Sequence, residues 1–169
     1  MEGRSAWERF ESLYRSSRDD LYAYVMTLLR DPVAAEDVTA LAFERAYRRR
    51  RTFDRRRVEE RAWLFGIARN AALDELRRRR RVARLVVEPS REDDAPVDRD
   101  EDEIILRRTT IRTALAELSA RDRELIALKF HAGLSNAEIA RVLGISESNA
   151  GTLLHRTIQK LRKACNAPA

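Results

Sequence analysis

Apolar residues recur at steps of three and four along most of this chain, the spacing of one face of a helix. A first helical segment is expected over residues 5–29, with Ser16-Ser17 as the point where it could be interrupted. A second begins at Asp31-Pro32, because Asp caps a helix and Pro fits its first position. A third covers residues 59–80. The expected apolar positions are Trp7, Phe10, Leu13, Leu21, Tyr24, Val25 and Leu28, then Val33, Val38, Leu41, Ala42 and Tyr47, then Leu64, Ile67, Ala68, Ala71 and Leu76.

The second half of the chain continues the helical pattern. Helices are expected over residues 104–116 and 119–131, the latter with Ser119 as its cap and Asp122 at its third position. The pattern then becomes much more specific between Leu134 and Ser148. Ser135 followed by Glu138 is a capping box, Gly144 ends a short helix, and Ser146 caps the next one.

Two helices joined by a short turn containing Gly have helix-turn-helix geometry, which places the second helix in a DNA major groove. An ordinary helical hairpin is the alternative. The capping and turn chemistry favours DNA binding. Glu147, Ser148, Asn149 and Thr152 could contact bases, whereas Arg141, His155 and Arg156 suit phosphate. Apolar packing is expected of Leu153, Leu154 and Ile158.

Charge is strongly segregated along the chain. Residues 48–57 hold seven Arg against one Asp, and residues 77–84 hold six Arg and no acid. Residues 88–103 then hold nine acids against two Arg, with two Pro and no helical apolar period before Ile104. With only five Gly and four Pro in 169 residues, the sequence predicts an all-α fold. It consists of two small helical domains, residues 5–81 and 104–165, joined by a flexible acidic linker at 82–103.

The composition leaves few other classes of function. A net charge of +6 suits a polyanionic partner. The lone Cys165, with His131 and His155 apart from it, gives neither a disulfide framework nor a metal site. No Gly-rich phosphate loop or nucleophile-base pair supports catalysis, and no cofactor is expected. No apolar run reaches the ~18 residues of a membrane span and no signal peptide is evident, so a cytoplasmic protein without membrane insertion is expected.

Residues 62–80 combine aromatic, amide and basic side chains. Rings can stack on unpaired bases while Arg neutralises phosphate, and Asn70 could recognise the edge of an extruded base. Trp63 and Phe65, taken singly, are more readily explained as core residues. The five consecutive Arg of residues 77–81 cannot all face inward, so this run is expected to face solvent or phosphate.

Three of these motifs together resemble the extracytoplasmic-function (ECF) type of bacterial RNA polymerase sigma factor, reduced to regions 2 and 4. Residues 35–46 are similar to that family's core-binding helix, and residues 63–78 to its −10-reading helix. Residues 134–145, with Leu154-His155-Arg156 and Leu161-Arg162, are similar to its −35-reading motif. The order and spacing of the three make the resemblance specific.

The resemblance implies a sigma factor without catalytic activity, which binds core RNA polymerase through the clamp helices and the flap and directs promoter-specific initiation. It also implies that an anti-sigma factor covers both domains, that the linker threads toward the RNA exit path, and that the free chain is a monomer which binds promoters poorly. The implied core-binding residues are Asp37, Thr39, Ala40, Phe43 and Glu44. Those for −10 DNA are Phe53, Trp63, Arg69, Asn70, Asp74, Arg77 and Arg78. Those for −35 DNA are Arg141, Ser146, Glu147, Ser148, Asn149, Thr152, His155 and Arg156.

The sequence departs from the family pattern at two places. Ala40 and Leu41 stand where a polar pair is frequent, which indicates a more apolar polymerase contact or a surface used by another partner. Gly151 and Leu153 stand where basic residues are frequent, so weaker or differently distributed −35 contacts are expected. A stand-alone DNA-binding regulator and a protein-interaction adaptor with a vestigial helix-turn-helix therefore remain alternatives.

Overall fold

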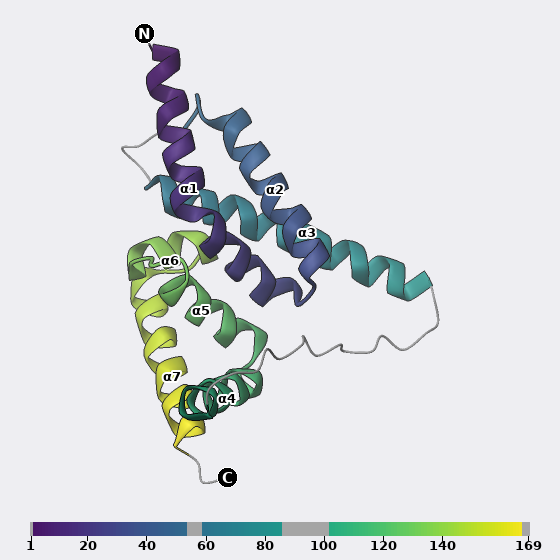
Figure 1. Ribbon diagram of the computed structural model, residues 1–169, viewed down its shortest axis with the longest axis vertical. Helices are drawn as coiled ribbons and strands as arrows, with labels where there is room; N and C mark the ends of the chain where they lie inside the picture. The colour runs from purple at the N-terminus through teal and green to yellow at the C-terminus, as the bar shows by residue number, and fades with distance from the viewer. Residues whose placement is uncertain (1, 54–58, 86–101, 167–169) are drawn as a thin grey trace.

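The computed structural model describes residues 2–53, 59–85 and 102–166, and the secondary structure in these ranges is entirely helical (Figure 1). This confirms the expected all-α class. The elements are α1 (Glu2–Leu29), α2 (Pro32–Arg49), α3 (Glu60–Leu85), α4 (Asp102–Glu117), α5 (Ala120–Phe130), α6 (Asn136–Leu143) and α7 (Glu147–Cys165).

Helix boundaries follow the expected caps closely, with two differences. The α1 helix runs through Ser16-Ser17 without a break, because Ser17 is buried and Ser16 bonds back to the Leu13 carbonyl at 3.3 Å. The α3 helix continues to Leu85, beyond the expected end near residue 80. Most of the predicted acidic linker, residues 86–101, lies outside the described residues.

The first domain consists of α1, α2 and α3, which pack against one another around a shared apolar core. Tyr24, Leu64 and Phe65 are among its fully buried side chains. Two apolar assignments are wrong. Val33 is 71% exposed, because it lies in the first turn of α2, directly after the cap and Pro32. Trp7 is 53% exposed near the start of α1, where its ring packs edge-on against Tyr47. Leu76 is only half-buried at the edge of the core.

The second domain consists of α4 to α7, with α7 packed against each of the other three helices. The capping box is present as expected: Glu138 N donates to Ser135 Oγ at 3.3 Å, and Ser135 N donates to the Glu138 carboxylate at 2.7 Å. Gly144 adopts the left-handed conformation with φ of 67°, which a residue without Cβ adopts at least cost.

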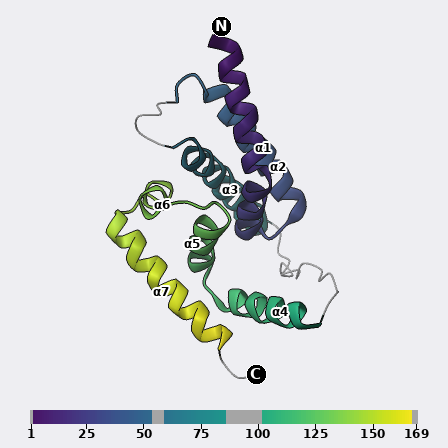
Figure 2. The same cartoon turned by 60° about the vertical axis from the view of Figure 1, so that its left-hand side comes forward.

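The two domains pack directly against each other. Figures 1 and 2 show α5 and α6 beside α1 and α3, with α7 on the side of the second domain away from α2. The contacts join α3 to α6 and α1 to α5. The arrangement leaves the outer face of α7 open while α6 covers part of α3.

Candidate nucleic-acid and polymerase interface

The first turns of α7 present a continuous polar surface. All of the residues expected to contact −35 DNA are exposed, namely Arg141, Ser146, Glu147, Ser148, Asn149, Thr152, His155 and Arg156. The Ser146 hydroxyl accepts from the Asn149 amide at 3.2 Å, so it caps the helix, and Thr152 Oγ1 donates to the Ser148 carbonyl at 3.0 Å. The structure therefore places these exposed residues on the helix-turn-helix, with Arg141 on α6, Ser146 at the N-cap of α7 and the others within α7.

The opposite face of α7 holds the helix in place. Leu154 and Thr157 are buried, and Leu153 and Ile158 pack against the core, as expected. Thr157 Oγ1 donates to Asp122 at 2.9 Å, and Lys160 Nζ donates to the other oxygen of that carboxylate at 2.7 Å.

Gly151 and Leu153 occupy packing positions. A Cβ built on Gly151 would lie 3.4 Å from Asn136 Nδ2 of α6, and Leu153 contacts the apolar core. Because these two positions pack inward, the absence of basic side chains there does not change the exposed polar surface of α7 that Glu147, Ser148 and Asn149 form.

The aromatic residues of α3 divide between core and surface. Phe65 is fully buried and lies 5.4 Å from the Tyr24 ring, which confirms its interpretation as core. Trp63 is half-buried and packs on Phe53 with ring centroids 4.6 Å apart. The predicted nucleic-acid rings thus form a pair at the start of α3, adjacent to residues 54–58, which lie outside the described residues.

Farther along α3, Asn70 and Asp74 are exposed, but Arg69 is not. The Arg69 side chain is 22% exposed, and its Nε donates to Glu124 Oε1 of α5 at 2.7 Å. Asp74 accepts from Arg77 at 3.1 Å. The sequence alone did not indicate Glu124 as a functional residue. The feature that could have done so is its position directly before the apolar run Leu125-Ile126-Ala127-Leu128.

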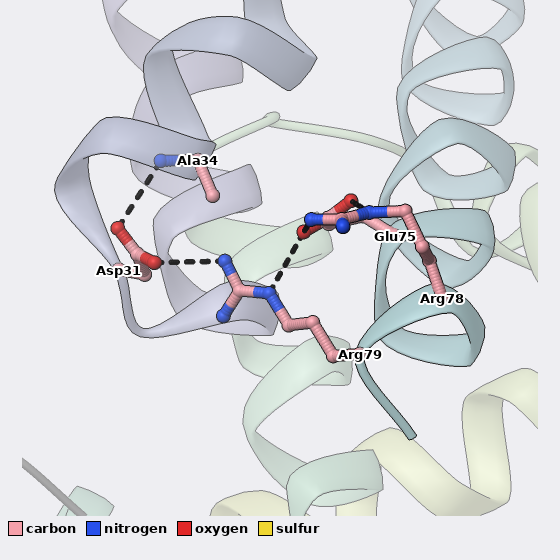
Figure 3. A network of polar contacts seen from close by, with 5 residues as sticks. All are labelled: Asp31, Ala34, Glu75, Arg78 and Arg79. Carbon is pink, nitrogen blue, oxygen red and sulfur yellow. Dashed lines mark hydrogen bonds and ion pairs between the residues drawn. The ribbon is translucent and has the colours of Figure 1, made fainter. Parts of the chain in front are cut away.

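The basic end of α3 forms an ordered network with the start of α2 (Figure 3). Glu75 accepts from Arg78 and from Arg79 at 2.8 Å, and Arg79 also donates to Asp31 at 2.8 Å. The second Asp31 oxygen accepts from the Ala34 amide at 3.1 Å. Hydrogen bonds from Arg78 and then Arg79 lower the pKa of Glu75 to about 2. Arg78 and Arg79 are therefore already paired, whereas Arg80 and Arg81 are exposed.

The surface expected to bind polymerase lies along α2. Asp37, Ala40 and Glu44 are exposed, whereas Thr39 and Phe43 are buried, Phe43 beneath Phe10 and Tyr14 of α1. A pocket of about 700 Å³ opens between the two helices, and Thr39 Oγ1 has no hydrogen-bond partner within the described part of the chain. Its lining includes Tyr14, Arg18, Asp19, Tyr22, Glu36, Thr39, Ala40 and Phe43.

Neither a membrane-spanning helix nor a cluster of metal ligands is found among the described residues. None of the helices in this part of the chain is long and apolar enough to cross a bilayer. The same residues hold no cluster of three or more His, Cys, Asp or Glu suited to a metal ion.

Comparison with known proteins supports the interpretation of both domains. Residues 13–82 match the family model of sigma-70 region 2, and residues 108–161 match that of sigma-70 region 4. The ECF RNA polymerase sigma factor SigL of Mycobacterium tuberculosis is 35% identical over 153 residues, which cover 89% of this chain and 85% of SigL.

Solved structures show the same fold. RpoE of Bartonella quintana, in complex with the anti-sigma factor NepR, superposes with a TM-score of 0.75 at 22% identity, covering 96% of this chain and 99% of RpoE. CnrH, in complex with the cytosolic domain of CnrY, superposes with a TM-score of 0.67 at 26% identity, covering 99% of this chain and 96% of CnrH. Together with the open polar face of α7 and the aromatic-basic α3 helix, these similarities establish that the chain belongs to the ECF family of RNA polymerase sigma factors.

Proposed function

We propose that this chain binds core RNA polymerase and directs it to promoters whose −35 and −10 elements it recognises, without catalytic activity of its own. The observation that carries the proposal is the open polar face of α7 in a chain whose other domain presents an aromatic-basic helix. Since its partners are polymerase and DNA, we also propose a cytoplasmic location.

In this proposal α3 opens and captures the −10 element. The Phe53–Trp63 pair lies at the start of α3, where a ring can stack on an unpaired base. Asn70 is exposed and can pair with a base edge. Among the described residues, Arg77 pairs only with Asp74, in an exposed ion pair that contributes little and is readily exchanged for phosphate.

The −35 element would be bound by α7. Glu147, Ser148, Asn149 and Thr152 lie on its exposed first turns, where they could reach base edges in a major groove. Arg141, His155 and Arg156 flank them and would contact phosphate. Domain orientation on the duplex would follow from these flanking contacts.

We assign the polymerase contact to α2 and the pocket beside it. Asp37 and Glu44 supply exposed charge, while Ala40, Thr39 and Phe43 line a recess in which the Thr39 hydroxyl has no partner among the described residues. A helix of the polymerase clamp that carries both apolar and polar side chains would suit this surface. An anti-sigma factor that covered it would prevent core binding.

Run-off transcription with purified core polymerase on genomic fragments tests the proposal directly. Discrete transcripts that depend on the added chain are expected. Core binding without initiation on any fragment would contradict it, and tight duplex binding without polymerase would favour a stand-alone regulator.

Residue roles are tested with Asn70→Ala, and Asn166→Ala at the C-cap of α7 is the matched control. Asn70→Ala should impair −10 opening, measured by permanganate reactivity of unpaired thymines, with core affinity unchanged. Equal loss of opening and core binding would remove Asn70 from the −10 site.

A further inference from the structure

Glu124 is a carboxylate of the second domain that lies buried against the first. It is 7% exposed, and its Oε1 accepts from Tyr24 Oη at 2.9 Å and from Arg69 Nε at 2.7 Å. Tyr24 belongs to α1 and Arg69 to α3, so one oxygen of α5 joins both helices. Burial first, and then the charge of Glu124, raises the pKa of Tyr24, so the phenol stays protonated as a donor.

A second polar contact joins the domains just after the C-terminal end of α5. Arg61 Nε donates to the Ala132 carbonyl at 2.5 Å, and its Nη2 donates to the His131 carbonyl at 3.3 Å. These carbonyls follow α5, where backbone acceptors lack helical partners and attract positive charge. Arg61 is itself fixed by Asp20 at 2.6 Å and by Ser17 Oγ at 3.0 Å.

A domain interface that contains a buried ion pair can fix one arrangement of the two domains and still open. The attraction within a buried ion pair is largely offset by the desolvation of both charges, whereas removal of one partner leaves the other charge buried and unpaired, which is strongly destabilising. When the domains separate, Glu124 and Arg69 both regain water. The two faces of an apolar interface of the same size would regain no such favourable hydration when they separate.

We infer that Glu124 is an intramolecular latch that closes the two domains and competes with nucleic acid for Arg69. A carboxylate and a phosphate bind a guanidinium by the same charge-assisted hydrogen bonds, so Arg69 cannot serve both at once. The latch follows from the contacts alone, whereas its effect on DNA binding rests on the proposed function. In the closed chain α6 also lies against α3, so the −10 and −35 surfaces are held in one fixed arrangement.

The first experiment compares the free full-length chain with Glu124→Ala, Glu124→Gln and Tyr24→Phe. Glu117→Gln is the control, because it removes the same charge from an exposed position of α4.

Small-angle scattering should give a larger radius of gyration for Glu124→Ala. Amide hydrogen exchange should rise on the facing surfaces of α3, α5 and α6, with helical circular dichroism retained. Tyr24→Phe keeps the ring in the core and removes only its hydroxyl, so a smaller opening is expected. Unchanged dimensions and exchange in all three variants would overturn the latch.

The second experiment measures how the free chain binds a promoter fragment identified by run-off transcription. Glu124→Ala and Glu124→Gln should bind about tenfold more tightly than the parent chain, about 1.4 kcal/mol, and more tightly than Glu117→Gln. A Glu124→Ala chain that opens without any gain over Glu117→Gln would overturn the competition for Arg69. If no promoter is found, the proposed function fails, while the scattering result still decides the latch.

Discussion

The guanidinium of Arg79 lies 2.8 Å from the carboxylate of Asp31, so the arginine run of α3 is tied to the residue that caps α2. The same Arg79 donates to Glu75, one turn before it on α3. Part of the run expected to face phosphate therefore organises the first domain. Neighbouring arginines of this run therefore have different roles.

Replacing Asp31 separates its two roles. Asp31→Ala should lower the urea midpoint of the chain, because the cap to Ala34 and the Arg79 partner are both lost. Asp31→Asn should lower it less, since Asn also caps helices well but carries no charge. Equal losses in the two variants would mean that the cap contributes nothing at this position.

Stability should fall in acid because of Glu75. Its pKa is about 2 in the folded chain against an ordinary value of 4.5, so folding favours the ionised form. That contribution is complete above about pH 4.5 and is lost as the pH falls toward 2.

Urea unfolding between pH 7 and 2.5 should show that the free energy of unfolding declines less steeply with falling pH for Glu75→Gln than for the parent chain. Part of the decline should persist, because the Ala34 amide lowers the pKa of Asp31 as well. An identical decline in the Glu75→Gln variant would contradict the assignment.

The salt dependence of promoter binding should distinguish the arginines. Arg80→Ala and Arg81→Ala should each reduce the slope of log affinity against log salt by about 0.9 if the exposed side chain neutralises one phosphate. Arg79→Ala should change the slope less, because Glu75 and Asp31 already hold this side chain. The measurement is fluorescence anisotropy of the polymerase complex on promoter DNA across a salt series. Equal slope changes for Arg79 and Arg81 would show that DNA displaces the network.

The capping box of the helix-turn-helix should be worth about 1 kcal/mol of unfolding free energy, lost in Ser135→Ala. Ser12→Ala in the exposed middle of α1 is the matched control and should change stability by only a few tenths of a kcal/mol. Chemical denaturation of both variants provides the comparison. A Ser135→Ala chain as stable as the control would mean that water replaces the cap.

Gly151→Ala should stabilise α7 by up to about 1 kcal/mol, because Ala is the better helix former and its Cβ would meet only Asn136 Nδ2 at 3.4 Å. Promoter affinity should be unchanged, since the position faces α6. Gly133→Ala should have the opposite sign, because Gly133 has φ of +66°. Loss of promoter affinity in a stable Gly151→Ala chain would place that residue at the DNA surface.

Local chemistry in the sequence was sufficient to predict most of the helices and their ends. Asp31, Ser119, Ser135 and Ser146 each cap a helix through a contact three residues ahead, so a short window of sequence contains the whole interaction. Gly144 ends α6 for a similarly local reason, its left-handed conformation. The outer face of α7 followed from helical periodicity applied to these boundaries.

What the sequence alone determined was therefore the helices, their caps and the residue types that suit DNA. Only the tertiary structure decided which of those residues are free to act. Arg69 and Asn70 are neighbours in α3, yet Arg69 is paired with Glu124 across the domain interface and Asn70 is exposed. Arg79 is likewise held by Asp31, 48 positions away. The physical reason is that a cap depends on atoms within one turn of chain, whereas the availability of a charge depends on partners that only the packing of distant helices brings within hydrogen-bond distance.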